Sequence, residues 1–269
     1  MYQPLIGKTA IVTGAAHGIG RAIARHFLDL GAQVMGADLD EAALADALPR
    51  GGEGTGLRHY AGDLTQRLAM ANLLSATLDA FERIDILVNA HRAIEPGEAL
   101  ACDEDALDRM MRLNVTSGLR LSQMVARRMI AQAEALGEDA PPCAGAIVNV
   151  STLAARRVHP DLLAYAIASA AQEQATRALA VALAPQRIRV NGVSFAGVMS
   201  ASLQAALKAE PALRDRLTEA TPLGRIAAPG ELAQAVAYLA GEGAGFVTGQ
   251  ILTVDGGRSL IDPSGVPVY

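Results

Sequence analysis

Short apolar runs alternate along this chain with longer segments whose apolar residues recur at helical spacing. A short apolar run between turn residues predicts a buried strand, and apolar positions repeating every three or four residues predict an amphipathic helix. Strands are expected at residues 9–12, 32–37, 57–60, 86–89, 146–151, 188–193 and 251–254, and helices at 19–30, 40–48, 65–81, 103–135, 164–184 and 229–240. Strands alternating with helices imply right-handed crossovers. The pattern therefore predicts an α/β fold, a doubly wound parallel sheet of seven strands in a single domain over residues 1–269.

Three segments carry neither pattern. Residues 49–56 and 138–145 are rich in turn-forming residues and predict surface connections. Residues 195–221 follow the sixth expected strand, and this variable segment is expected to shape the substrate site.

Composition and charge narrow the class of protein. The chain is 51% hydrophobic and 19% charged, which is enough apolar material for a large core. Its net charge of −5 and its lack of Lys/Arg clusters argue against a nucleic-acid partner. No apolar run is long enough for a membrane span, and a first strand within ten residues of Met1 leaves no room for a signal peptide. Cys102 and Cys143 match no metal or redox spacing. We expect a cytoplasmic protein with no metal site and no membrane partner.

The segment Thr13–Gly20, which reads T-G-A-A-H-G-I-G, lies between the first expected strand and the first expected helix. In this context a glycine pattern indicates phosphate binding, because the helix N-terminus offers free N–H groups and a positive dipole end. Gly14 is expected to permit the tight turn, Gly18 to allow the backbone to approach the ligand, and Gly20 to let the helix lie close to the strand. His17 and Ile19 complete the expected pyrophosphate loop. The alternative is an ordinary strand-to-helix turn.

Asp38 ends the second expected strand, about 20 residues beyond the glycines. An acidic residue there binds the adenosine ribose of NAD, and its charge repels the 2′-phosphate of NADP. No Arg or Lys follows directly, so the sequence favours NAD over NADP. Asp38 as the N-cap of the helix over 40–48 is the competing interpretation.

These motifs, with others further along, resemble the NAD(P)-dependent short-chain dehydrogenase/reductase family, particularly its β-ketoacyl-carrier-protein-reductase-like members. The matching segments occur in order over essentially the whole chain: Gly14, Gly18 and Gly20; Asp63-Leu64; 85–89; Asn114; 147–152; Tyr165; 187–191; and 254–257. The resemblance implies a Rossmann-type sheet and a homodimer or homotetramer. It also implies cofactor contacts from Asp63, Leu64, Asn89, Ala90, Ser169 and Val198.

The resemblance further implies hydride transfer between a nicotinamide and a small-molecule carbonyl or alcohol. Tyr165 matches the family's proton donor and acceptor, and Asn114 matches its water-relay residue. Thr152 stands 13 positions before Tyr165, where the family has a Ser that holds the substrate oxygen. A threonine keeps the hydroxyl group. Ser151 is expected to face the other way, because neighbouring strand residues alternate.

The position of the family's active-site Lys, four residues after Tyr165, holds Ser169. The chain has only two lysines, Lys8 and Lys208, and neither is close to it in sequence. A phenol ordinarily ionises near pH 10, so a general base near neutrality needs a neighbouring cation. The sequence therefore predicts impaired alcohol oxidation and an activity that favours reduction.

Two more departures lie near the expected nicotinamide site. Ala90-His91-Arg92 stands where the family has Asn-Ala-Gly, so Arg92 takes the place of the Gly. Phe195-Ala196 stands where the family has Pro-Gly. One hypothesis is that Arg92 or His91 replaces some of the lost positive charge; the alternatives are a solvated loop or an obstruction to the cofactor. Arg156, Arg157 and His159 near Tyr165 suit either an anionic substrate or a solvated surface. The sequence thus predicts an oxidoreductase, with a catalytically degenerate cofactor-binding or scaffolding member of the family as the alternative.

Overall fold

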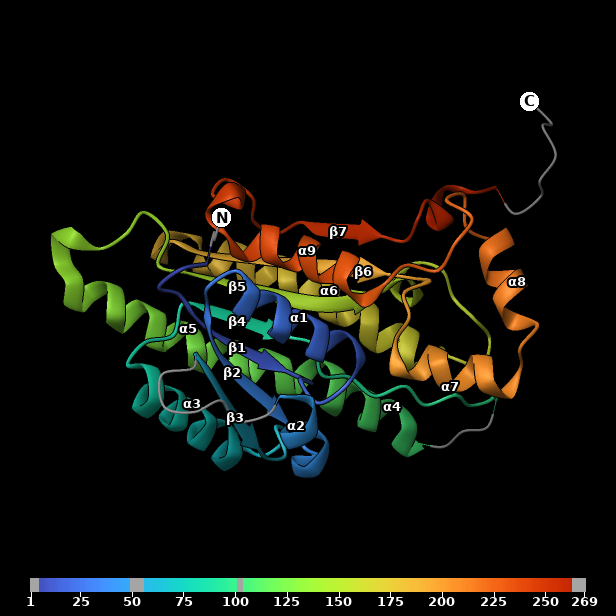
Figure 1. Ribbon diagram of the computed structural model, residues 1–269, viewed down its shortest axis with the longest axis horizontal. Coiled ribbons are helices and arrows are strands. Elements are labelled where there is room, and N and C mark those ends of the chain that lie inside the picture. Colours follow the sequence, from blue (N-terminus) through green and yellow to red (C-terminus); the bar gives the residue numbers. More distant parts are fainter. Residues whose placement is uncertain (1–4, 49–55, 101–103, 263–269) are drawn as a thin grey trace.

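The computed structural model of the chain describes residues 5–48, 56–100 and 104–262 (Figure 1). Seven parallel strands form one sheet in the order β3-β2-β1-β4-β5-β6-β7. The strands are β1 Thr9–Thr13, β2 Gln33–Asp38, β3 Leu57–Ala61, β4 Ile86–Asn89, β5 Gly145–Thr152, β6 Ile188–Phe195 and β7 Ile251–Val254. The predicted doubly wound α/β fold is confirmed. Strands β1 to β3 are added toward one edge of the sheet and β4 to β7 toward the other, so the order switches between β1 and β4. Such a switch point opens a crevice at the carboxyl ends of the strands.

Nine α-helices surround the sheet within the described part of the chain. They are α1 Gly18–Asp29, α2 Glu41–Ala47, α3 Arg67–Phe81, α4 Glu104–Met111, α5 Ser117–Leu136, α6 Leu163–Leu183, α7 Ala201–Ala209, α8 Leu213–Glu219 and α9 Pro229–Ala240. Helices α1 and α9 pack against each other over one face of the sheet, and α3, α5 and α6 cover the other (Figure 1).

Two hydrophobic cores explain why the central strands carry apolar residues at consecutive positions. In β1, Ala10 and Val12 belong to the core beneath α1 and α9, whereas Ile11 belongs to the core beneath α3 and α5. Side chains on a strand alternate between the two faces, so a strand covered on both faces needs a continuous apolar run. The short apolar runs in the sequence therefore correspond to strands that helices cover on both faces of the sheet.

The structure differs from the expected elements in three places. Strand β6 continues to Phe195, so this residue is part of the sheet and not of a turn. The expected helix over 103–135 is interrupted by a π-helical turn, η1, at Arg112–Thr116. The variable segment 195–221 contains two helices, α7 and α8, that the sequence pattern did not predict. All of the turn predicted at 49–56 except its last residue, and also Cys102, lie outside the described residues.

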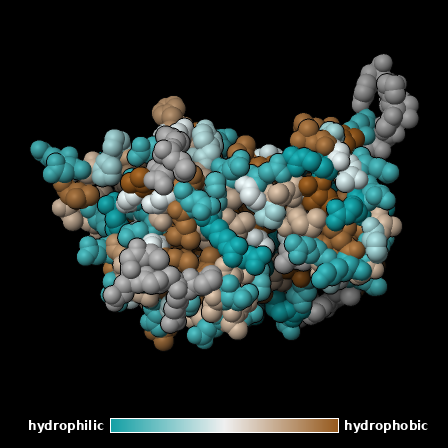
Figure 2. Space-filling model, viewed as in Figure 1, coloured by the Kyte–Doolittle hydropathy of each residue, from teal (hydrophilic) through white to brown (hydrophobic). Residues whose placement is uncertain are grey.

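Helices α7 and α8 stand at the end toward which the strands point (Figure 1). Beside them, Leu223, Leu260 and Ile261 expose 66%, 85% and 40% of their surface. Figure 2 shows hydrophobic side chains gathered on this upper corner of the molecule. The carboxyl edge of the sheet is thus bordered by apolar surface. None of the helices in the described ranges combines the length and apolarity that crossing a bilayer requires.

Candidate active site

The glycine loop joins β1 to α1 in the geometry expected of a phosphate-binding turn. Gly14 has φ +68°, and a Cβ there would lie 2.9 Å from the Cα of His91. A Cβ on Gly20 would lie 2.0 Å from the Gly14 carbonyl oxygen. Helix α1 begins at Gly18 without a side-chain cap at His17 and without an acidic residue in its first turn. Its N-terminal dipole therefore remains available to an anion.

Asp38 lies beside this loop at the carboxyl end of β2. Its Oδ2 accepts a hydrogen bond from the Ala16 backbone N–H at 3.0 Å, and its Oδ1 accepts from Leu39 N–H at 2.7 Å. The N-cap of α2 is Asp40, whose Oδ1 accepts from Ala43 N–H at 2.9 Å. The alternative that Asp38 caps this helix is therefore wrong. The carboxylate of Asp38 is instead held against the glycine loop.

Two neighbouring cavities border the glycine loop and share Gly14, Asp38, His91 and Arg92. The first, of about 200 Å³, is also lined by His17, Gly18, Ile19, Gly20, Ala90, Ser200 and Ser202. The second, of about 320 Å³, is also lined by Leu39, Gly62, Asp63, Leu64, Thr65, Ala93, Leu113 and Ser117. Asp63 accepts hydrogen bonds from the N–H and hydroxyl of Thr65, which lower the pKa of its carboxyl group. The shared residues make the two cavities one groove.

The segment after β4 is fixed by a buried network around Thr13. The Thr13 hydroxyl oxygen accepts from the backbone N–H of Ala90 at 3.0 Å and lies 2.7 Å from His91 Nδ1. The Ser117 hydroxyl donates to the Leu113 carbonyl at 2.6 Å, so it accepts from His91 Nε2, 2.8 Å away. Burial of the ring lowers the pKa of His91 to about 4. His91 is therefore neutral near pH 7 and does not supply the missing positive charge.

Two asparagines predicted at the site make structural contacts through their side chains. Asn89 is 1% exposed and donates to Ser122 Oγ at 2.9 Å and to Asn149 Oδ1 at 2.8 Å. Its Nδ2 is thus bound within the core, its buried Oδ1 has no hydrogen-bond partner among the described residues, and its backbone is the part that would meet a cofactor. Asn114 lies in the π-helical turn, where its Oδ1 accepts from Ala93 N–H at 2.8 Å and its Nδ2 donates to the Ala93 carbonyl at 2.9 Å. The oxygen and the nitrogen of the Asn114 side-chain amide thus both hold the loop that carries Arg92.

Tyr165 lies in the first turn of α6 and is 4% exposed. Its ring packs in an apolar cluster with Met110, Val115 and Ala168. Its hydroxyl accepts a hydrogen bond from Arg92 Nη1 at 2.8 Å. This contact supports the hypothesis that Arg92 replaces some of the lost positive charge, because its guanidinium reaches Tyr165 from the loop after β4.

The remaining predicted residues lie around this pair. The Arg92 guanidinium carbon stands 4.6 Å from the centre of the Phe195 ring, and Phe195 is opposite Thr152 in the pairing of β5 with β6. The Thr152 hydroxyl lies 3.5 Å from the Phe195 carbonyl oxygen. Ser169 is buried, and its hydroxyl donates to the Tyr165 carbonyl at 2.7 Å. Its proton is thus bound within its own helix. Val198 is buried in a bridge to Ala227.

The basic residues between β5 and α6 turn away from Tyr165. Arg156 pairs with the buried carboxylate of Glu173 at 3.1 Å, and Arg157 donates to the Ser259 carbonyl at 2.6 Å. Ser151 also faces Glu173, 3.5 Å away, on the opposite side of β5 from Thr152. The suggestion that these two arginines bind an anionic substrate has no support in this geometry.

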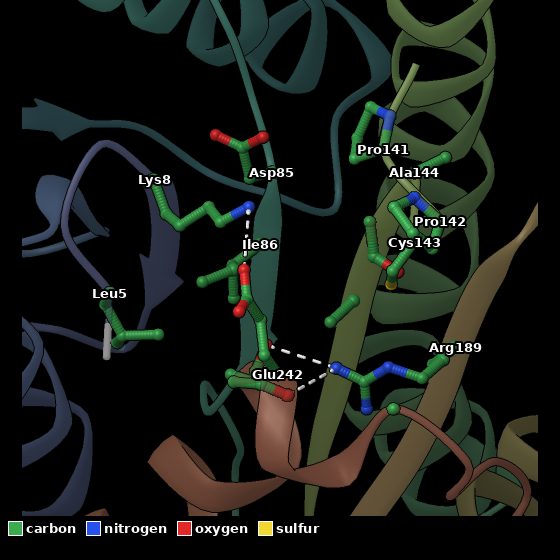
Figure 3. A pocket seen from close by; sticks show the side chains of 15 residues that line it. Leu5, Lys8, Asp85, Ile86, Pro141, Pro142, Cys143, Ala144, Arg189 and Glu242 are labelled. Atoms are coloured by element: carbon green, nitrogen blue, oxygen red, sulfur yellow. Dashed lines mark hydrogen bonds and ion pairs between the residues drawn. The ribbon is translucent and has the colours of Figure 1, made fainter. Parts of the chain in front are cut away.

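Another cavity, of about 320 Å³, opens at the opposite, amino edge of the sheet (Figure 3). Lys8 there points toward Glu242, at 3.8 Å. Arg189 donates to the carbonyls of Leu239, Ala240 and Gly241, and so caps the end of α9. None of the predicted site residues lines this cavity. The groove at the carboxyl edge is therefore the candidate active site, and Lys8 lies too far from it to replace the missing lysine. No cluster of three or more metal-ligating side chains occurs in the described ranges.

The chain is similar to known proteins over nearly its whole length. A family model described as Enoyl-(Acyl carrier protein) reductase matches residues 14–259. A galactitol 2-dehydrogenase (L-tagatose-forming) of Cereibacter sphaeroides is 34% identical, with 95% of this chain and 96% of that protein covered. A 2,3-dihydroxy-2,3-dihydro-p-cumate dehydrogenase of Pseudomonas putida is 31% identical, with 96% of each covered. A gluconate 5-dehydrogenase from Burkholderia cenocepacia, solved with NADP and tartrate, superimposes with a TM-score of 0.86 at 28% identity, covering 97% of this chain and 98% of that chain.

Proposed function

The chain belongs to the short-chain dehydrogenase/reductase family of nicotinamide-dependent oxidoreductases, and we propose that it transfers a hydride between NAD and a small carbonyl or secondary-alcohol substrate. The observation that carries this proposal is the position of Tyr165. Its hydroxyl meets a guanidinium at 2.8 Å, and that guanidinium lines the groove beside the glycine loop. A phenol, a permanent cation and a phosphate-binding turn thus meet at the carboxyl edge of the sheet.

The groove fits a dinucleotide. The free helix N-terminus at Gly18–Gly20 would hold the pyrophosphate, Asp38 the adenosine ribose, and Asp63-Leu64 the adenine end. The backbone of Asn89 and Ala90, together with Ser169 and Val198, would border the nicotinamide end. When bound, the nicotinamide supplies the hydride for reduction or accepts it in oxidation.

The residues of this chain supply the proton and hold the substrate oxygen. In reduction, the Tyr165 O–H bond breaks and its proton forms the O–H bond of the alcohol product. In oxidation, ionised Tyr165 takes the proton from the alcohol oxygen as the carbonyl forms. Thr152 would donate a hydrogen bond to that oxygen, and Asn114 would act as a positioning residue through Ala93.

The guanidinium at Tyr165 alters the expected direction of the reaction. The sequence-based preference for reduction rested on the absence of a cation, which would leave too little ionised tyrosine for oxidation. With Arg92 in contact, we expect both directions to operate near neutral pH. The preference for reduction is expected to emerge only in a variant that lacks Arg92.

The preference for NAD over NADP rests on Asp38. Its carboxylate lies in the groove and is fixed by the backbone N–H groups of Ala16 and Leu39. A 2′-phosphate placed there would meet this fixed negative charge. The structural relative from Burkholderia cenocepacia holds NADP, so this preference is a property proposed for this chain alone.

Association into a homodimer or homotetramer is also proposed. Ile167 and Val181 on α6 expose 44% and 78% of their surface, and Leu107 on α4 exposes 41%. Burial of such apolar side chains against a second copy would be favourable.

A ligand-binding and turnover experiment tests the proposal. NAD and NADP are each added to the protein, and the shift in its unfolding temperature is measured; turnover is then followed with a panel of small ketones, secondary alcohols and acyl thioesters. We expect stabilisation by NAD and turnover that Tyr165→Phe lowers by at least about 100-fold. Stabilisation by NAD without turnover on any substrate favours a cofactor-binding or scaffolding role, and no stabilisation by either dinucleotide contradicts the proposal.

A further inference from the structure

The charged partner of Tyr165 does not come from α6, the helix that carries Tyr165 itself. Arg92 belongs to the loop after β4, whereas the position four residues along α6 holds the uncharged Ser169. We infer that Arg92 is a catalytic residue of the reaction proposed above, and that it stabilises negative charge on the Tyr165 oxygen while Phe195 fixes the plane of its guanidinium. This inference rests on the proposed function for its chemical meaning. Its geometry is independent of any substrate.

The loop that carries Arg92 is held on both sides. Before it, the Thr13 hydroxyl binds the N–H groups of Ala90 and His91, at 3.0 and 3.3 Å. After it, Asn114 binds both the N–H and the carbonyl of Ala93. An arginine is a long side chain that loses considerable freedom when it is ordered. A backbone fixed on either side lowers the entropic cost of holding its guanidinium at Tyr165.

Phe195 supplies the second constraint. Its ring is 5% exposed and lies at the end of β6, with the guanidinium carbon 4.6 Å from its centre. A cation over an aromatic face is attracted by the ring. A flat guanidinium stacks on such a face while its N–H groups still donate sideways. The two departures from the family pattern, at Arg92 and Phe195, therefore form one contact that points at Tyr165.

The chemistry follows from the permanent charge of arginine. A guanidinium stays protonated and does not exchange its proton with substrate, so it does not replace Tyr165 as the acid or base. Its N–H donates to the phenol oxygen, and a charge-assisted hydrogen bond of this kind stabilises the ionised phenol more than the neutral one. The alcohol proton then passes to Tyr165 in oxidation and returns from it in reduction.

The other groups around Tyr165 leave Arg92 as the charged residue in contact with its hydroxyl. Met110, Val115 and Ala168 pack on the ring and carry no charge. His91, the titratable neighbour on the loop, is neutral near pH 7 because burial lowers its pKa to about 4. Ser169 donates its proton to the backbone of α6.

Ionisation of Tyr165 in the cofactor-free protein tests this inference without relying on turnover. The chain has no Trp and five Tyr, so tyrosinate absorbance is not obscured by indole. A pH titration is recorded for the unmodified protein and for Tyr165→Phe, and the difference gives the step that belongs to Tyr165. The same step is then measured in Arg92→Gln, in Phe195→Leu and in the control Arg25→Gln, whose arginine binds the Ala47 carbonyl.

We expect the tyrosinate step of Tyr165 to move to higher pH in Arg92→Gln than in the unmodified protein, because an opposite charge in contact with the phenol oxygen favours the ionised form. Phe195→Leu should give a smaller shift in the same direction, and Arg25→Gln none. Phe195→Leu also keeps the test decisive if Arg92→Gln does not fold. Coincident titrations in the unmodified protein, Arg92→Gln and Phe195→Leu would overturn the inference. A shift without any NAD-dependent turnover would leave this contact standing and refute the proposed function instead.

Discussion

Replacement of Gly20 by alanine tests the glycine loop most severely. A Cβ at this position would stand 2.0 Å from the Gly14 carbonyl oxygen, 2.6 Å from its carbon and 3.1 Å from the Thr13 carbonyl oxygen. All three are backbone atoms of the turn that starts the groove, so none is able to rotate away. The only relief is a displacement of α1 from β1, and that displacement would move the N–H groups of the helix N-terminus.

The expected cost follows from this contact. Overpacking a well-ordered interior ordinarily costs about 1–3 kcal/mol, and a clash with backbone places Gly20→Ala at the upper end, at about 3 kcal/mol. For a domain of this size, 1 kcal/mol corresponds to about 2–4 °C in Tm. We therefore expect Gly20→Ala to unfold about 6–12 °C below the unmodified protein. Saturating NAD, which at 100 times its Kd stabilises a binding protein by about 2.7 kcal/mol, should raise the Tm of the unmodified protein only.

Thermal unfolding with and without NAD measures both effects. Gly230→Ala is the matched control, because it is also a helical glycine but a Cβ there meets no atom within 4 Å. Alanine is the better helix former by about 1 kcal/mol, so the control should unfold at the same or a higher temperature and respond fully to NAD. A Gly20→Ala protein that matched the unmodified one in both Tm and NAD response would refute the reasoning.

Three further predictions concern single residues. Asp38→Ser should move the NADP-to-NAD affinity ratio toward NADP by about tenfold or more, which is about 1.4 kcal/mol, measured by titration with each dinucleotide; an unchanged ratio would contradict the ribose role of Asp38. Because the native pKa of His91 is about 4 and its ordinary value is 6.5, the unfolded chain binds a proton first as pH falls through this range. The free energy of unfolding should thus decrease between pH 6.5 and 4 by at most about 3 kcal/mol more than in His91→Asn, and parallel urea-unfolding curves for the two proteins would refute this. Arg189→Met should leave three carbonyls of α9 unpaired and lower stability by about 2–4 kcal/mol in urea unfolding, without weakening NAD binding at the other edge; weaker NAD binding would contradict the separation of the two edges.

Local residue patterns were enough to predict the sheet. Strands β1 to β6 bury apolar side chains on one or both faces, and the apolar run at residues 9–12 is the sequence signal of such burial. The glycine turn was also predictable, because it depends on local geometry. Gly14 has a positive φ, and a Cβ on Gly20 would clash with the Gly14 carbonyl, only six residues away. Helices α7 and α8 were not predicted, since their short segments within 195–221 bury little apolar surface and so carry little periodic signal. The π-helical turn was missed because it is fixed by a contact between Asn114 and Ala93, which lie 21 residues apart.

The contact of Arg92 with Tyr165 and Phe195 could not be predicted from the sequence. Ser169 correctly indicated that α6 supplies no cation, and Arg92 and Phe195 were recognised as departures from the family pattern. Their contact depends on strands β4 and β6, which are separated by β5 in the sheet. The spacing of residues along the chain does not indicate that side chains from these two strand ends come into contact. Likewise, Thr13 and Ser117 gave no sequence signal, although they fix His91 as a neutral ring.

The pH dependence of alcohol oxidation tests the central claim most directly. The rate constant kcat with NAD is measured from neutral to high pH in the unmodified protein, in Arg92→Gln and in the control Arg25→Gln. With Arg92 as the charge that stabilises negative charge on the Tyr165 oxygen, Arg92→Gln should need a higher pH to reach its maximal rate and should lose about tenfold or more at neutral pH. Its reduction rate should fall less, and the control should follow the unmodified protein. Superimposable profiles for the unmodified protein and Arg92→Gln would contradict the account.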